Sequence, residues 1–234
     1  MSTAVVIGIG PGLGMSMAHR FGREGHTVAL VSRTDTRHAD YVATLAEQGV
    51  TASSHVADVR DRDHLLSTLD AIGDVDVLYY GPGAIDLDLR PAPITETTAA
   101  EVRSMMDVVY PAVDVVAHVL PGMLARGAGG LLFAGGLSAV VPLPFLGALA
   151  VTSAALRNYV VTLNAGLAGT GVYAGSLTIG GLIARGDIHE HVLSRPEQFG
   201  DVPPQTLDPD AIAETAWQMY TSRDRAEEVF SVLG

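Results

Sequence analysis

The chain has 234 residues with 48% hydrophobic content, which is enough for one α/β domain with a sizeable apolar core. A formal net charge of −12 argues against nucleic acid as a partner, and the absence of cysteine excludes disulfides, thiolate chemistry and zinc–thiolate sites. No basic leader precedes the first apolar strand, and the longest apolar run, residues 139–151, contains two prolines and is too short to span a bilayer. We therefore expect a cytoplasmic protein that does not bind membranes.

Apolar strands alternate with helical patterns along the whole sequence. The strands are expected over 5–9, 27–31, 50–56, 75–80, 130–134, 172–179 and 228–232. The helices are expected over 13–24, 37–48, 60–71, 98–126, 147–168 and 209–222, the last with Asp208 as its N-cap. Continuously apolar strands indicate a parallel sheet covered on both faces, and βα alternation indicates right-handed crossovers. We therefore predict one Rossmann-type doubly wound domain over 1–234, with about seven parallel strands in a three-layer α/β/α arrangement.

The first strand runs into a glycine-rich turn. Gly8, Gly12 and Gly14 have the spacing G-x-x-x-G-x-G, and Gly10 is a fourth glycine. Glycine at these points permits the turn, a close approach of the backbone to a pyrophosphate, and close packing of the next helix on the sheet. That helix begins near Leu13 and directs free N–H groups and a positive dipole end at the phosphates. Purely structural turns also use glycine, but the strand–turn–helix context favours nucleotide binding.

Further segments give the chain a recognisable pattern over nearly its whole length. They are residues 21–33, the pair Asp58-Val59, the pair Leu120-Pro121 and residues 154–156. With the glycine turn, these segments resemble the short-chain dehydrogenase/reductase family, although Ile7 stands where that family often has threonine. The resemblance implies a substrate lid near 182–206. It also implies a homodimer or homotetramer in which the two long helices, 98–126 and 147–168, pair across a two-fold axis.

The end of the second strand indicates which cofactor is preferred. A dehydrogenase specific for NAD usually has an acidic residue there for the ribose 2′-hydroxyl, whereas this chain has Ser32, Arg33 and Thr34. The guanidinium of Arg33 offers a fork of donors to a 2′-phosphate, so we predict NADP(H) in preference to NAD(H). The alternative is that Arg33 is solvated or paired with Asp35.

The resemblance assigns other cofactor contacts. Asp58 is similar to the family aspartate that accepts a hydrogen bond from the adenine amino group, and it could also cap the helix that begins near residue 60. The remaining contacts implied are Val59, Gly81, Pro82, Gly83 and Ser153.

The catalytic side chains of the family are replaced. That family uses a tyrosine as general acid, a lysine that lowers the tyrosine pKa, a serine that binds the carbonyl, and an asparagine that anchors a relay water. Alignment by the flanking residues puts Leu149, Ser153, Gly136 and Val108 at these four positions. No Y-x-x-x-K occurs, and all 14 basic residues are arginine, so the standard carbonyl-reduction mechanism is not encoded.

Three side chains are weak substitutes: Ser138, Tyr80 and Thr152. A substrate contact by Ser138 competes with a plain turn role. Tyr79 and Tyr80 should point to opposite faces of their strand and are more often packing residues. The remaining candidates, for which core, surface or solvated roles are the default, are Asp107, Tyr110, His118, His189 and His191. We propose no metal site, and we expect Pro111 to kink its helix.

Three functions remain open. The first is an NADP(H)-dependent oxidoreductase that transfers hydride to a small carbonyl, enone or imine with an unorthodox proton donor, for example water. The second is a non-redox enzyme, such as a cyclase, isomerase or dehydratase. The third is a catalytically inactive cofactor-binding or assembly protein. We favour the first because the cofactor motifs are retained, although the fold does not decide among them.

Overall fold

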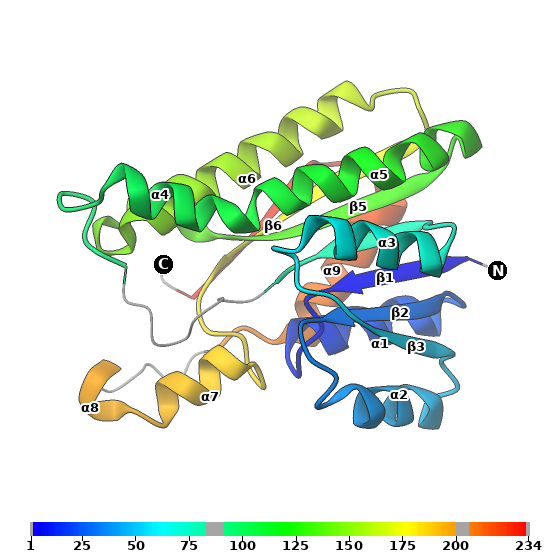
Figure 1. Cartoon of the computed structure of the whole chain (residues 1–234), viewed down its shortest axis with the longest axis horizontal. Coiled ribbons are helices and arrows are strands. Elements are labelled where there is room, and N and C mark those ends of the chain that lie inside the picture. Colours follow the sequence, from blue (N-terminus) through cyan, green and yellow to red (C-terminus); the bar gives the residue numbers. More distant parts are fainter. Residues whose placement is uncertain (1, 83–90, 200–205, 233–234) are drawn as a thin grey trace.

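The computed structural model describes residues 2–82, 91–199 and 206–232, and a parallel sheet lies at its centre (Figure 1). Its seven strands pair in the order β3-β2-β1-β4-β5-β6-β7. They are β1 (Thr3–Ile7), β2 (Thr27–Ser32), β3 (Ala52–Val56), β4 (Val77–Tyr80), β5 (Gly129–Gly136), β6 (Val172–Gly180) and β7 (Glu227–Ser231). The predicted doubly wound Rossmann-type sheet is therefore confirmed.

Helices cover both faces of the sheet. They are α1 (Leu13–Arg23), α2 (His38–Glu47), α3 (Arg62–Ile72), α4 (Ala99–Met105), α5 (Tyr110–Arg126), α6 (Gly147–Gly166), α7 (Asp187–Leu193), α8 (Pro196–Phe199) and α9 (Pro209–Ser222). Helices α1, α2 and α9 share one hydrophobic cluster with the sheet, and α3, α5 and α6 share the other. Along β1, Val5 and Ile7 face the second cluster while Ala4 and Val6 face the first. Both faces of the strand are buried, which is why its sequence is apolar without alternation.

Several predicted boundaries need correction. Strand β1 ends at Ile7 rather than at residue 9, because Gly8 has φ = +92° and turns the chain out of the sheet. The predicted helix over 98–126 is two helices separated by one 3₁₀ turn at Met106–Val108. Pro111 lies in the first turn of α5, where its missing N–H is tolerated, so the break precedes the proline. Helices α7 and α8 were not predicted.

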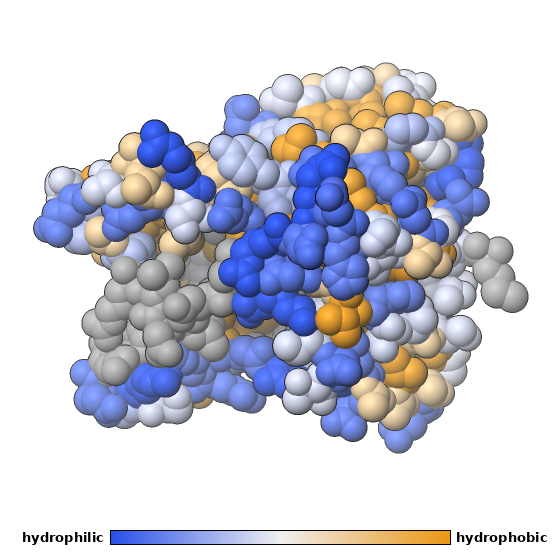
Figure 2. Space-filling model, in the orientation of Figure 1, coloured by the Kyte–Doolittle hydropathy of each residue, from blue (hydrophilic) through white to orange (hydrophobic). Residues whose placement is uncertain are grey.

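The segments Ala99–Arg126 and Pro144–Gly166 are each long and apolar enough to cross a membrane by length and composition alone. In this fold they lie along one face of the sheet and expose apolar side chains on their outer side, including Val113, Leu124 and Val151. Figure 2 shows apolar residues gathered along the edge of the molecule where Figure 1 places α5 and α6. The exposed apolar face is thus a property of two helices that also form the core.

Candidate functional site

A cleft of about 1040 Å³ opens at the carboxyl ends of the strands. Figure 1 shows α4 and α7 projecting beyond the sheet on this side. The cleft is lined by these residues, all predicted from the sequence to contact a cofactor: Gly8, Gly10, Gly12, Leu13, Gly14, Ser32, Arg33, Thr34, Asp58, Val59, Gly81, Pro82 and Ser153. Gly83, the remaining predicted contact, lies outside the described residues. The structure thus brings together residues from five different parts of the chain.

The glycine turn is closely packed. A side chain at Gly8 would collide with the carbonyl of Gly81, and one at Gly14 would lie 2.8 Å from the carbonyl oxygen of Gly8. Helix α1 can therefore begin directly beside the end of β1. Gly12 is its N-cap residue, and the described residues place no side-chain cap and no acid at this first turn. Its N–H groups and positive dipole end can therefore bind an anion such as a pyrophosphate.

Three other helices begin differently. Asp61 caps α3, Asp208 caps α9 as predicted, and Thr98 with Glu101 forms a capping box at α4. A side-chain cap satisfies the first N–H groups of a helix and so competes with a ligand for them. Among these four helix starts, the glycine turn at α1 is the one suited to a phosphate.

The end of β2 forms a second wall of the cleft. The Ser32 hydroxyl donates to the carbonyl of Thr34 at 3.0 Å and lies 2.7 Å from His38 Nε2, so that nitrogen must carry a proton to complete the second bond. His38 is buried, and burial lowers its pKa. The neutral imidazole therefore fixes the loop that carries Arg33, while Ser32 is already bonded within the protein.

Asp58 lies at the end of β3 beside Arg60. The Arg60 guanidinium donates to the Asp58 carboxylate at 2.5 to 3.2 Å, and this bonding is the main reason that the pKa of Asp58 falls to about 2. The Arg60 backbone N–H also donates to Asp58 at 3.0 Å. The alternative that Asp58 caps the following helix is wrong, because the His64 N–H is accepted by Asp61. Asp58 remains ionised and available as an acceptor at the rim of the cleft.

The opposite end of the cleft is apolar and contains the four residues that the sequence alignment predicts at the catalytic positions: Val108, Gly136, Leu149 and Ser153. A methyl group added at Gly136 would lie 3.1 Å from Ser153 Oγ and 3.5 Å from Ser138 Oγ. Two hydroxyls therefore converge on the position that the family gives to serine. Thr152 is buried, and its hydroxyl donates to the Leu149 carbonyl at 3.2 Å. That bond makes Thr152 a local helix contact.

Tyr79 and Tyr80 point to opposite faces of β4 and are both buried. The Tyr80 hydroxyl donates to the backbone carbonyl of Val108 at 2.7 Å, and burial raises its pKa. This bond ties β4 to the break between α4 and α5. A phenol with a raised pKa and an internal acceptor is a poor proton donor to a substrate.

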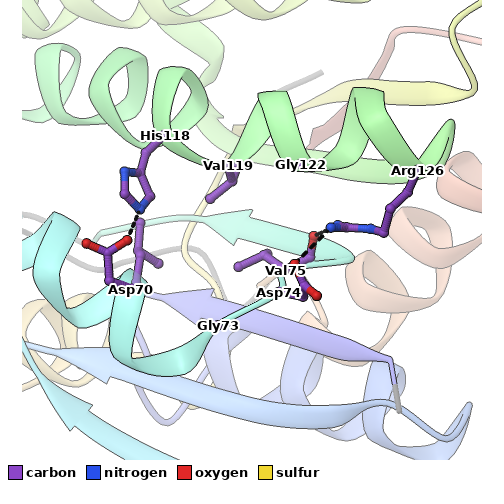
Figure 3. Close-up of a pocket in the computed structure, with 9 residues that line it drawn as sticks. Asp70, Gly73, Asp74, Val75, His118, Val119, Gly122 and Arg126 are labelled. Atoms are coloured by element: carbon purple, nitrogen blue, oxygen red, sulfur yellow. Dashed lines mark hydrogen bonds and ion pairs between the residues drawn. The ribbon is translucent and has the colours of Figure 1, made fainter.

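Other candidate residues lie outside the cleft. A separate groove of about 390 Å³ lies between α3 and α5. His118 Nε2 lies 3.0 Å from Asp70 there, and Arg126 pairs with Asp74 at 3.1 Å; Figure 3 shows both contacts. His118, expected from the sequence to be a satisfied or interface histidine, thus has a partner in Asp70 and lies outside the cleft. Tyr110 is exposed, and His189 and His191 lie on α7. Within residues 2–82, 91–199 and 206–232, no His, Asp or Glu triplet could hold a metal ion.

Among the titratable residues that line the cleft, sequence reasoning missed five: Arg37, His38, Tyr41, Arg60 and Asp187. Arg37 and Arg60 are the first residues of the helices predicted over 37–48 and 60–71, so a search for cations at the helix starts that follow strands could have found them. Asp187 is distant from every motif in sequence and gave no such signal.

Comparisons with known proteins agree with this geometry. A family model described as short chain dehydrogenase matches residues 2–187. The chain is 29% identical over 160 residues to a very-long-chain 3-oxoacyl-CoA reductase of Laccaria bicolor, covering 67% of this chain and 47% of the relative. It is 31% identical over 124 residues to the 3-dehydrosphinganine reductase TSC10B of Arabidopsis thaliana, covering 52% of this chain and 36% of that protein. The chain thus spans about half or less of the length of these relatives.

Solved structures share the fold. A putative NAD(P)-dependent gluconate 5-dehydrogenase from Beutenbergia cavernae, solved with bound NADP, has a TM-score of 0.79 at 25% identity, covering 99% of this chain and 94% of that chain. A 3-oxoacyl (acyl-carrier-protein) reductase from Agrobacterium tumefaciens with NADP bound has a TM-score of 0.81 at 21% identity, covering 98% and 92%. The fold and the cleft define a dinucleotide-fold protein of the α/β class. With the family model matching most of its length, this chain belongs to the short-chain dehydrogenase family.

Proposed function

We propose that the protein binds NADP(H) and transfers hydride between this cofactor and a small organic substrate, with a proton donor other than the family tyrosine. The observation that supports the proposal most directly is that the two ends of the cleft differ in chemistry. An uncapped helix start and arginines from the ends of β2 and β3 lie at one end, and an apolar surface with the Ser138 and Ser153 hydroxyls lies at the other. Relatives named as reductases, and a similar structure solved with NADP, support it.

The residues present fit the cofactor. The N–H groups of α1 would hold the pyrophosphate, Arg33 the 2′-phosphate and Asp58 the adenine amino group. When bound, the nicotinamide supplies or accepts a hydride. Ser153 would orient the nicotinamide ribose or the substrate oxygen, and Leu149 would exclude bulk water. One water held beside the Ser153 hydroxyl would deliver the proton and leave as hydroxide, since the Tyr80 hydroxyl is bonded within the protein and no other side chain described at this end is a stronger acid.

Titration with NADPH, NADP⁺ and NADH tests this proposal. We expect wild-type protein to bind NADPH more tightly than NADH. Arg33→Ala should weaken NADPH binding by about 10- to 100-fold and leave NADH nearly unchanged, since a hydrogen bond to a charged group is worth about 1.5–3 kcal/mol. Arg62→Ala is the matched control, because this α3 arginine pairs with Asp114 instead of lining the cleft.

The outcomes separate the three functions. If none of the three nucleotides binds at millimolar concentration, the oxidoreductase proposal is wrong. If NADPH binds but its absorbance does not fall with any carbonyl, enone or imine, a cyclase, isomerase or dehydratase, or an inactive cofactor-binding or assembly protein, is supported instead.

We also propose a homodimer or homotetramer and a cytoplasmic location. The exposed apolar residues of α5 and α6 support the first, since burying them against a second copy would remove them from water. Light scattering at micromolar concentration should give at least twice the monomer mass, and a monomer would contradict the proposal. Cell fractionation tests the location.

A further inference from the structure

Residues 182–187, which we call the strap, lie beside the glycine turn, and four of them line the cleft. A methyl group added at Gly12 would lie 3.1 Å from the Cα of Gly186, so the two backbones are in close contact. Leu207 pairs with the strap through two backbone bonds, donating to Leu182 at 2.8 Å and accepting from Ala184 at 2.9 Å. The strap is thus an ordered part of the cleft wall.

Arg185 fixes one side of the strap to the body of the protein. Its Nη2 lies 2.8 Å from Asp210 Oδ2 and 3.2 Å from Ser16 Oγ, which joins the strap to α9 and α1. Arg185 has φ = +66°, a left-handed conformation that few residues other than glycine adopt. The contacts of its guanidinium therefore hold a backbone geometry that brings the next two residues to the cleft wall.

Asp187 joins the other side of the strap to Arg37. Both of its carboxylate oxygens accept from Nη1 of Arg37, at 2.7 and 3.0 Å, although the two residues are 150 positions apart. The same Nη1 lies 3.5 Å from the Tyr41 hydroxyl. Nε and Nη2 of Arg37 make no hydrogen bond to the residues that the structure describes, so most N–H donors of this guanidinium have no acceptor among those residues.

The Arg37–Asp187 pair contributes little to the stability of the fold. Its side chains are 51% and 42% exposed, and an exposed pair of this kind is worth about 0–1 kcal/mol. The position of the pair in the cleft indicates its role better than its contribution to stability does. Arg37 lines the same end of the cleft as Arg33 and Thr34, and the planar guanidinium can serve one anion with Nη1 and a second with its other donors.

We propose that Asp187 determines cofactor specificity by positioning Arg37 as a second ligand of the 2′-phosphate of NADP(H). This inference rests on the proposed function and deepens it. Asp187 is a positioning residue, since it acts through Arg37. Because the strap carries Asp187, the 2′-phosphate and the closed strap stabilise one another, so NADP(H) closes the cleft more firmly than NAD(H).

The direction in which Asp187→Asn changes the affinity for NADPH distinguishes this mechanism from simple charge repulsion. Asp187 carries a negative charge near the expected site of a phosphate. If charge alone mattered, Asp187→Asn would strengthen NADPH binding. If Asp187 positions Arg37, the same substitution weakens it, because Arg37 loses the contact that orders its side chain.

The test is a set of dissociation constants for NADPH and NADH. We expect Asp187→Asn to weaken NADPH binding by about 5- to 10-fold and to change NADH binding by less than about 2-fold. Glu190→Gln is the matched control, since it removes one negative charge from the same helix at a residue without the Arg37 contact. In an Arg37→Gln background, Asp187→Asn should have no further effect, as expected for two residues acting as one unit.

Several results would overturn the inference. They are tighter or unchanged NADPH binding by Asp187→Asn, equal weakening of NADPH and NADH, and an additive effect in the Arg37→Gln background. A wild-type protein that binds neither nucleotide contradicts the proposed function itself. A wild-type protein that prefers NADPH, with an Asp187→Asn variant whose ratio of NADPH to NADH affinity is undiminished, contradicts only the role of Asp187.

Discussion

The two ends of the cleft differ in how their side chains are held. At the end beside the glycine turn, which we call the nucleotide end, Asp58 pairs with Arg60 and Arg37 pairs with Asp187. A buried His38 fixes the loop after β2 there. At the opposite end, which we call the reaction end, Leu149 and Ser153 are the residues predicted at the family's tyrosine and lysine positions, and the nearby polar groups are hydroxyls.

Under the proposed function, nucleotide recognition and proton transfer would be carried by separate residues of one fold. Recognition would use the glycine turn and the loops after β2 and β3, whereas the positions predicted for proton chemistry lie on β5, on α6 and at the break before α5. A chain can therefore change one set while keeping the other. Four variants, one of them with three substitutions, test this division in order of decreasing expected effect.

Gly8→Ala should damage the nucleotide end most severely. Its φ of +92° strains any side chain, and the new methyl group would collide with the carbonyl of Gly81. We expect a loss of about 3 kcal/mol in the free energy of unfolding, measured by urea denaturation. Gly10→Ala is the control, because the nearest atom to its added methyl is 4.0 Å away. Equal losses in both variants would contradict this account of the turn.

The reaction end should gain activity when the family side chains are restored. We expect Gly136→Ser, Leu149→Tyr and Ser153→Lys together to raise the rate of ketone reduction with NADPH by about 100-fold, since general acid catalysis contributes about 10²–10⁴. The control has Leu149→Phe with the other two changes, because a phenyl ring cannot donate a proton. If the triple variant binds NADPH and gains nothing, the alignment of these positions is wrong.

The Tyr80→Phe variant tests whether the role of Tyr80 is structural or catalytic. Removing its hydroxyl leaves the Val108 carbonyl without this donor, so we expect a loss of about 1–2 kcal/mol in the free energy of unfolding. The single-turnover rate of NADPH oxidation should not change. Tyr110→Phe, at an exposed ring, should affect neither quantity. A rate that falls 10-fold or more with unchanged stability would instead identify Tyr80 as the acid.

Asp58→Asn should have the smallest effect on the free energy of unfolding, and that effect should be present above about pH 4 and vanish as the pH falls towards 2. The pKa of Asp58 is about 2 in the folded protein, below the ordinary aspartate value of 3.8, so its pairing stabilises the fold above about pH 4. That contribution is lost as the pH falls from about 4 towards 2. It should be less than about 1 kcal/mol, because Asp58 and Arg60 are partly exposed.

The measurement for Asp58→Asn is the change in urea midpoint between pH 5 and pH 3. The wild type should lose more stability over this interval than the variant does. Asp63→Asn, at a side chain that is 94% exposed, is the control and should follow the wild type. A variant whose midpoint falls as much as that of the wild type contradicts the role of the Asp58–Arg60 pair.

The fold could be predicted from the sequence because apolar strands and glycine turns are local signals. The order of the elements and the edge of the sheet that carries the cleft both follow from them. Pro111 indicated a distortion of the long helix, but the exact position of the break before α5 could not be predicted, since the 3₁₀ turn there is bonded at the Val108 carbonyl by Tyr80 of another strand. The Arg37–Asp187 pair was missed for the same reason, since its partners meet only in the folded chain.

The position of Ser153, beside Gly136 in the cleft, has a practical consequence. The sequence contains no lysine. A Ser153→Lys variant would therefore carry a single ε-amino group, placed where the family's proton chemistry occurs. Isotope-labelled lysine would give one side-chain NMR signal that needs no assignment. Its titration would report directly on the polarity of the reaction end, with and without nucleotide.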